Sequence, residues 1–199
     1  MGQYYLLVNI DKQQCFPSLI MEDNTLINIC GQKLIELVNN VGIKPYLILL
    51  LAHRWNGNRL VLVGDYANLN PYLTKEEQEK YESLFEYAHV HFKVIHPRTF
   101  QYDTDQHAHK SYIITNGKQY MDPVDMGDEP SYVQWLNNSR ISTGLVILLG
   151  YSNQGNDLNV LSGDWAGDRI QIIEKHTVDV STLENISKDV LKRIDQCIS

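Results

Sequence analysis

Two segments of the chain share the pattern Trp-x-Gly-x-Arg, and their side chains have the greatest capacity for binding chemistry. The first contains Trp55 and Arg59, and the second contains Trp165 and Arg169. An indole face beside a guanidinium could hold a nucleic base or another planar anion by stacking and charge. In the structural alternative, each tryptophan closes the core over a turn. Because the pattern occurs twice, the structural alternative is favoured.

Carboxylates near the ends of expected strands form a second group. Asp65 follows an apolar strand in Gly-Asp-Tyr, a place that suits a catalytic or metal-binding acid and equally suits a turn. Asp11 and Lys12, just past the first expected strand, present the same choice. If the tryptophan motifs are structural, their arginines would pair with a nearby acid such as Asp65 or Asp168. No partner base can be identified for these acids, so turn roles are favoured.

Histidines form the third group. His89 and His91 stand two residues apart in a segment with strand-like alternation, which would place both imidazoles on one face at a spacing that can chelate a metal. His107 and His109 repeat the spacing downstream of two aspartates. A metal-activated water would imply a hydrolase. Chance is the alternative, since the chain has neither His-Glu-x-x-His nor paired cysteines. We therefore predict no cofactor, with a divalent metal at His89 and His91 as the minority interpretation.

Composition argues against several classes of function. The 24 acidic and 17 basic residues give a net charge of -7, and no Lys/Arg run could neutralise a row of phosphates, so we expect neither nucleic-acid nor membrane binding. Three cysteines without paired spacing indicate buried thiols in a reducing, cytoplasmic compartment. The longest apolar run, residues 46–52, is too short to span a bilayer. Phosphate-binding, dinucleotide-binding and nucleophile-elbow glycine motifs are missing from the sequence.

The elements that must position these residues occur twice. Tyr-Leu-Leu-Val-Asn at 5–9 matches Tyr-Ile-Ile-Thr-Asn at 112–116, and each is followed by Lys-Gln. The tryptophan motifs, each preceded by an apolar run (47–51 and 145–149), come next. Capping boxes then follow at Thr74 with Glu77 and at Ser181 with Glu184, and each is expected to open a helix. The three matches recur in the same order at offsets of 107, 110 and 107 residues.

These matches predict an α+β fold made of two diverged tandem copies of a strand-helix-strand-helix unit, packed about a pseudo-twofold axis. The first copy is expected at 1–96, a polar connection at 97–110 and the second copy at 111–199, with helices near 31–40 and 132–138. Units of this size bury little apolar surface alone, so one shared globule is expected. The alternative is a single α+β domain with coincidental motifs.

Four segments resemble a family of uncharacterised proteins from bacteria and large viruses: Met-Gly-Gln-Tyr-Tyr at 1–5, Val-Asn-x-Asp-Lys at 8–12, Gly-Asp-Tyr-Ala at 64–67 and Trp-Ala-Gly-Asp-Arg-Ile at 165–170. The resemblance covers about a third of the chain. In that family the last motif leads directly into Gly-Asp-Tyr-Ala. Here the contiguous version has Asn58 for the aspartate, and the fuller motif at 165 leads into Glu-Lys-His, a split that two diverging copies would produce. The resemblance implies relatedness and no activity.

The functional expectation is a non-enzymatic interaction or structural protein, part of a larger assembly, with a protein partner. The alternative is a metal- or arginine-assisted enzyme acting on a nucleotide or phosphorylated small molecule through Asp65, Asp168, Arg59 or Arg169. The two hypotheses differ in where they place the functional side chains, because an enzyme needs its acids, bases and arginines within reach of one pocket. The sequence indicates no oligomeric state.

Overall fold

The structure is a computed structural model that describes residues 4–16, 44–65, 67, 72–95, 110–128, 140–151 and 163–198. It has helices and a mixed sheet, so the α+β class is confirmed. The strands are β1 (Tyr5–Asn9), β2 (Gln14–Phe16), β3 (Asn58–Gly64), β4 (Lys93–Val94), β5 (Tyr112–Thr115), β6 (Gln119–Met121), β7 (Gly150–Tyr151), β8 (Arg169–Glu174) and β9 (Glu184–Asn185). The helices are α2 (Lys44–Ala52), α3 (Lys75–Gln78), α4 (Leu84–His91), α6 (Arg140–Leu149) and α7 (Ser187–Ile198), with 3-10 turns η3 (Val124–Met126), η4 (Lys175–Thr177) and η5 (Val180–Thr182).

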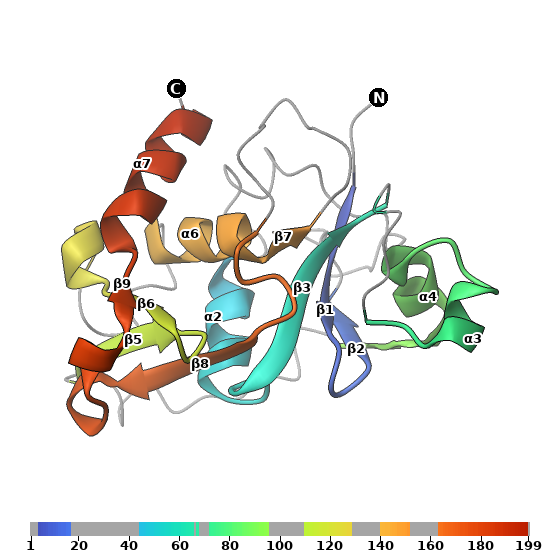
Figure 1. Ribbon diagram of the computed structural model, residues 1–199, viewed down its shortest axis with the longest axis horizontal. Helices are drawn as coiled ribbons and strands as arrows, with labels where there is room; N and C mark the ends of the chain where they lie inside the picture. The colour runs from blue at the N-terminus through green and yellow to red at the C-terminus, as the bar shows by residue number, and fades with distance from the viewer. Residues whose placement is uncertain are drawn as a thin grey trace, which may run out of the picture.

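Within the described residues the nine strands form one sheet in the order β4-β2-β1-β3-β8-β5-β6-β9, and β7 pairs with β3 off this path (Figure 1). At the centre, β3 and β8 are antiparallel, with Arg59 opposite Arg169. Outward from this pair, β1 and β5 are antiparallel to their inner neighbours, and β2 and β6 complete hairpins. Both edge strands, β4 and β9, are parallel to their partners. The two halves of the sheet therefore have the same strand order and directions.

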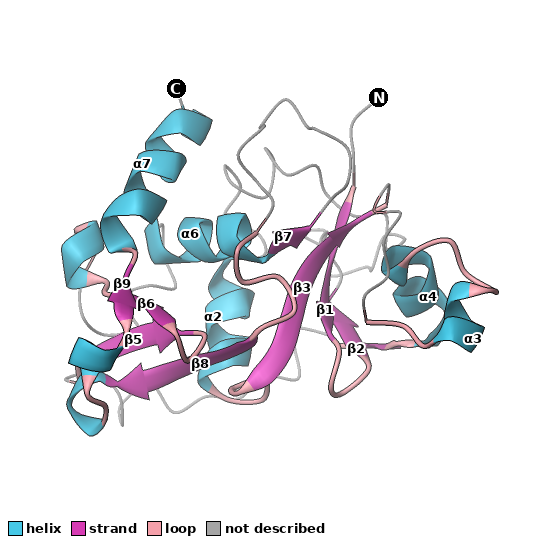
Figure 2. Ribbon diagram, in the orientation of Figure 1, coloured by secondary structure: helices cyan, strands magenta, loops and turns pink. Residues whose placement is uncertain are grey.

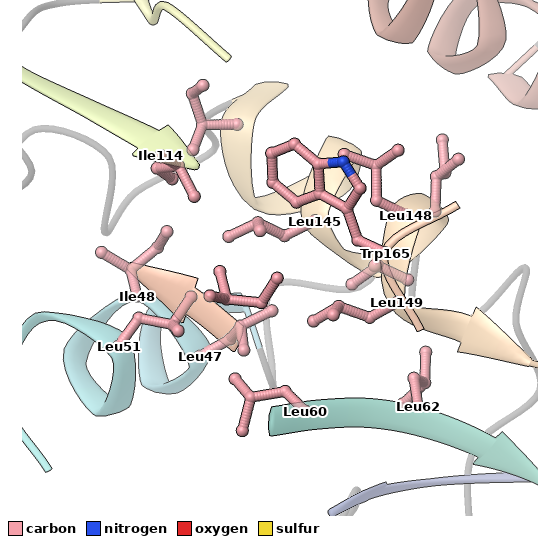
Figure 3. Packing of buried hydrophobic residues seen from close by; sticks show 14 of the residues in the cluster. Leu47, Ile48, Leu51, Leu60, Leu62, Ile114, Leu145, Leu148, Leu149 and Trp165 are labelled. Carbon is pink, nitrogen blue, oxygen red and sulfur yellow. The ribbon is translucent and has the colours of Figure 1, made fainter. Parts of the chain in front are cut away.

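The main core lies between one face of the sheet and the helices α2, α6 and α7 (Figures 1 and 2). Alternate strand residues such as Leu60 and Leu62 point into it, because successive side chains of a strand face opposite sides. Residues 47–51 of α2 are buried throughout, as expected of a helix that is apolar on all sides. Figure 3 shows Trp165 packed against Leu145 and Leu148 of α6 in this core.

A second, smaller core lies on the opposite face of β1, β2 and β3. Leu6, Val61 and Val63 meet Leu84 and Ala88 of α4 there. Figure 1 shows α3 and α4 beside β1 and β2, at the other end of the molecule from α7. Arg59 alternates along β3 with the residues of the main core, so its side chain lies on the same face as Val61 and Val63, which pack against α4. Arg169 is opposite Arg59 in the pairing of β3 with β8 and therefore lies on that face too.

The first expected capping box is confirmed. Thr74 Oγ1 accepts from the backbone N–H of Glu77, and the Glu77 carboxylate accepts from the backbone N–H of Thr74 at 2.8 Å. The helix that it opens, α3, ends at Gln78. A new cap at Ser83, whose Oγ accepts from the backbone N–H of Glu86 at 3.1 Å, then begins α4.

The second expected capping box is wrong. Ser181 lies in the 3-10 turn η5, and Glu184 lies in β9, paired with β6. The Glu184 carboxylate accepts from Gln119 Nε2 at 2.7 Å across that pair, so it caps no helix. Helix α7 begins later, at Ser187. The expected helices near 31–40 and 132–138 and the connection at 97–109 lie outside the described residues.

Cys15 and Cys197 are free and buried, in agreement with the expectation of buried thiols. Burial raises the pKa of the Cys15 thiol to about 11 and raises that of Cys197. Cys30 lies outside the described residues. In the described part of the chain, no helix has the length and apolar character needed to cross a membrane.

Candidate functional site

Two asparagines, Asn9 at the end of β1 and Asn116 directly after β5, connect the hairpins to the tryptophan motifs. Each accepts backbone N–H bonds from its own hairpin turn. The amide of Asn9 then donates to Asn58 Oδ1 at 2.9 Å, and the amide of Asn116 donates to Asp168 Oδ2 at 2.8 Å. The same polar link therefore joins hairpin and motif in both halves. The expected pairing of Asp168 with an arginine is replaced by this bond to Asn116.

Both tryptophans of the motifs are fully buried, with 0% of their surface exposed. The indole N–H of Trp55 donates to Gln14 Oε1 and that of Trp165 to Gln119 Oε1, each at 2.9 Å. The interpretation in which these indoles stack on a ligand beside the arginines is wrong, because rings enclosed in the core present no face to a ligand. The two glutamines were not predicted, since the sequence matched Gln13, rather than Gln14, with Gln119.

Each tryptophan motif makes a tight turn that reaches across the sheet. Gly57 and Gly167 have φ values of 74° and 80°, where glycine avoids the Cβ crowding that other residues meet. The N–H of Gly57 donates to Ile170 O at 2.8 Å, and that of Gly167 donates to Leu60 O at 2.7 Å. The turn before β3 therefore bonds to β8, and the turn before β8 bonds to β3. The expected turns are confirmed, and these bonds set the positions of Arg59 and Arg169, which follow the turns in β3 and β8.

Arg59 and Arg169 converge on Asp11, and we call these three residues the Arg-pair site. Arg59 contacts Asp11 Oδ1 through Nε at 2.6 Å and Oδ2 through its backbone N–H at 3.0 Å. Arg169 Nη1 donates to Asp11 Oδ2 at 2.8 Å and to Gly57 O at 3.1 Å. The arginine side chains are 42% and 62% exposed and that of Asp11 is 19% exposed. Two surface cations therefore share one carboxylate.

The charges around the site shift two pKa values. Burial alone would raise the pKa of Asp11, but hydrogen bonds and charge from Arg59, together with the charge of Arg169, hold it below its usual value. Burial, reinforced by Tyr151 and Asp168, raises the pKa of Tyr72 to about 12, against the opposing charge of Arg59. The Tyr72 hydroxyl donates to Ala166 O at 2.7 Å and therefore stays protonated at neutral pH. Tyr72 is therefore an uncharged side chain in contact with the turn at residues 166–167.

The other predicted acid, Asp65, lies away from this site. It follows β3 at the end opposite Arg59, six residues further along, or about 20 Å at the usual rise of a strand. Its Oδ1 accepts from the backbone N–H of Tyr4 at 3.1 Å. The expected pairing of Asp65 with Arg59 or Arg169 is thus wrong, and its bond to Tyr4 joins the end of β3 to the residue before β1. Lys12 Nζ donates to the carbonyl of Arg54.

The predicted metal site at His89 and His91 is not formed as expected. Both residues lie on helix α4 rather than on a strand, so two positions correspond to roughly 200° around the axis and the imidazoles diverge. His89 stacks on Phe85 with centroids 6.3 Å apart, whereas His91 Nε2 contacts the hydroxyl of Tyr81. The described residues contain no group of three or more His, Cys, Asp or Glu able to hold a metal. His107 and His109 lie outside them.

Asn56, which follows Trp55, was not predicted to have a role. Its side-chain amide accepts from Ile172 N and donates to Ile172 O, both at 3.2 Å, and so imitates a neighbouring strand. At the matching place on β3, Leu62 is paired instead with Gly150 of β7. The only signal in the sequence was the difference between Asn56 and Ala166 at the same position of the two motifs.

A pocket of about 200 Å³ lies elsewhere, between the end of the sheet and α7. It is lined by Gln119, Leu148, Asp164, Glu184, Ile186, Asp189, Val190 and Arg193. Arg193 Nη1 pairs with Asp164 at 2.7 Å across it. None of the predicted site residues lines this pocket.

Comparison with known proteins gives no assignment. No protein-family model matches the chain, and no curated protein or solved structure matches it. Function is therefore inferred from the site itself, where two arginines from distant segments are held at the surface by one acid.

Proposed function

We propose that this chain is a non-enzymatic interaction protein of a larger intracellular assembly, which docks a protein partner on the face around the Arg-pair site. The observation that carries the proposal is the convergence of Arg59 and Arg169 on the single carboxylate of Asp11. A chain with net charge -7 has concentrated two partly exposed cations at the middle of its sheet. Clusters of arginine are a common means of recognising acidic partners.

The proposal includes a tandem duplication, with the pseudo-twofold axis passing between β3 and β8. The matching strand order, the paired Trp–Gln bonds and the paired asparagine bonds support it. A chance resemblance of two halves would not be expected to repeat both kinds of polar contact. In this view Arg59 and Arg169 are equivalent residues that meet at the axis, and docking depends on both copies.

The two copies differ in the acidic residues that can pair with Arg59 and Arg169. The turn between Asn9 and Gln14 is two residues longer than that between Asn116 and Gln119, and Asp11 lies in the longer turn. The second copy therefore has no counterpart of this acid, and one carboxylate serves two arginines. Two equivalent acids would have neutralised the pair, whereas a single one leaves it with a positive charge.

We also propose relatedness to the bacterial and large-virus proteins that the sequence resembles. The resembling segments at 8–12 and 165–170 contain Asp11 and Arg169, which are in contact.

The alternative function, an arginine-assisted enzyme, would require Arg59, Arg169 and the acids to line a pocket. The pocket beside α7 is lined by different side chains.

Site-specific photo-crosslinking tests the docking proposal. A photoreactive residue replaces Gln171, which is exposed and two positions from Arg169 on the same face, or in a control replaces exposed Lys192 on α7. We expect one partner from an extract of the producing organism to be cross-linked at 171 and not at 192. The Arg59→Gln/Arg169→Gln double variant should lose this product. Equal labelling at both positions, or labelling that survives the double variant, would contradict the proposal.

A further inference from the structure

We infer that the Arg-pair site recognises carboxylate side chains of an acidic peptide segment, an inference that rests on the proposed docking function. Asp11 already displays the chemistry of the site. Its two oxygens receive donors from the Arg59 side chain, the Arg59 backbone and the Arg169 side chain. The arrangement is built to surround one carboxylate.

The guanidinium groups of Arg59 and Arg169 retain N–H donors for a second carboxylate. Arginine offers five N–H donors in a planar fork. Among the described residues, no hydrogen bond engages either Nη of Arg59, nor Nε or Nη2 of Arg169, while these side chains are 42% and 62% exposed. An incoming carboxylate can therefore bind the outer side of both forks without displacing Asp11.

The local charge suits an anion. Lys12, Arg59 and Arg169 contribute three positive charges, against two negative charges from Asp11 and Asp168. The remainder of the chain is strongly acidic, with a net charge of -7 overall. The site therefore carries a net positive charge, whereas the rest of the chain carries a net negative charge.

Neighbouring groups favour a peptide over a nucleic acid. The exposed amide of Gln171, which lies two positions from Arg169 on the same face of the sheet, can bond to a peptide backbone. A nucleic-acid backbone requires cations along a track, with affinity that grows with each phosphate neutralised. Two forked cations at one point instead suit one or two carboxylates, which arginine binds bidentately.

Fluorescence anisotropy with labelled peptides tests the inference. The probe is a peptide of alternating Glu and Gly, compared with its Gln/Gly analogue, a phosphoserine/Gly analogue and a single-stranded oligonucleotide of similar charge. We expect the wild-type protein to bind the Glu peptide in preference to the Gln peptide, with affinity that falls as salt rises. The Arg59→Gln/Arg169→Gln variant should bind it at least about tenfold more weakly, because charge-assisted hydrogen bonds are lost.

Two further variants separate recognition from folding. Lys80→Gln/Lys192→Gln removes the same charge from positions elsewhere on the surface and should bind as the wild type does. Asp11→Asn removes the internal competing charge and should bind the Glu peptide more tightly, whereas a purely structural Asp11 would predict weaker binding or none. Urea unfolding of each variant verifies that it is folded in the binding buffer.

Four results would overturn the inference: equal binding of the Glu and Gln peptides, no loss in the double arginine variant, tighter arginine-dependent binding of the phosphoserine peptide, or the same for the oligonucleotide. If the Glu peptide fails while the cross-linked partner at position 171 still depends on the arginines, only the carboxylate assignment is lost. If both fail, the docking function is lost with it.

Discussion

Substitution of Gly167 by alanine probes how tightly the second tryptophan motif is built. Its φ of 80° lies in the left-handed region, which costs an alanine about 1–2 kcal/mol. A Cβ at this position would also lie 2.0 Å from the hydroxyl oxygen of Tyr72 and 2.3 Å from its Cζ. Because ordinary contacts exceed about 3.4 Å, the tyrosine ring must move by more than an ångström.

That movement adds to the backbone term. It breaks the bond from the Tyr72 hydroxyl to Ala166 O, worth about 1 kcal/mol, and disturbs a half-buried ring packed on the smaller core, worth about 1–2 kcal/mol. We therefore expect Gly167→Ala to lower the free energy of unfolding by about 3–5 kcal/mol. For a chain of this size each kcal/mol lowers the Tm by about 2–4 °C, so the loss in Tm is roughly 10 °C.

Two matched glycines supply the controls. Gly117 has φ of 88° and an added Cβ there would meet nothing within 4 Å, whereas Gly57 has φ of 74° and an added Cβ would lie 3.4 Å from Gln171 Nε2, an ordinary contact. Alanine at either should cost only the backbone term of about 1–2 kcal/mol. Urea unfolding followed by circular dichroism measures all three, and Tyr72→Ala in the Gly167→Ala background should recover part of the loss. Equal costs at the three glycines, without coupling to Tyr72, would refute the steric explanation.

Three further predictions concern the polar contacts. Asn56→Ala should destabilise the protein by about 1–3 kcal/mol in urea unfolding, because both backbone groups of Ile172 lose their partner; a loss below about 0.5 kcal/mol would contradict it. Gln14→Leu and Gln119→Leu should each cost about 1–3 kcal/mol by leaving a buried indole N–H without an acceptor, and very unequal costs would argue against equivalent halves. Since the pKa of Asp11 is lowered on folding, its stabilising contribution is complete above the unfolded pKa of about 4 and declines as pH falls through the lower, folded pKa. The difference in urea midpoint between wild type and Asp11→Asn should accordingly be constant from pH 7 to 5 and shrink towards pH 3.

Local signals in the sequence predicted the turns well. The glycines of the tryptophan motifs, the strand that ends in Asn9, the strand that ends just before Asn116 and the first capping box were all recognisable, because each depends on residues within a few positions of one another. The apolar runs at 47–51 and 145–149 were not assignable, since a continuous run has no period that separates helix from strand. They form α2 and α6, which are buried on all sides.

Contacts between distant segments were beyond sequence reasoning. Asp11 bonds to Arg59 and Arg169, which are 48 and 158 positions away, so its role as the shared counter-ion depends on the finished sheet. The apparent strand alternation at His89 and His91 failed because a short segment fits either period, and the cap at Ser83 together with apolar contacts selects the helix. Asp65 was a plausible partner for Arg59 because it is close in the sequence, but in the folded sheet the two residues lie at opposite ends of β3.

Arginine side-chain NMR gives the most direct test of docking at the Arg-pair site. The Nε–Hε signals of Arg59, Arg169 and, as a control, Arg193 beside Asp164 are followed while the alternating Glu/Gly peptide is added. We predict that the signals of Arg59 and Arg169 shift together along one binding curve, while that of Arg193 stays in place. Shifts that follow two unrelated curves, or a response confined to Arg193, would contradict a single docking site shared by the two halves.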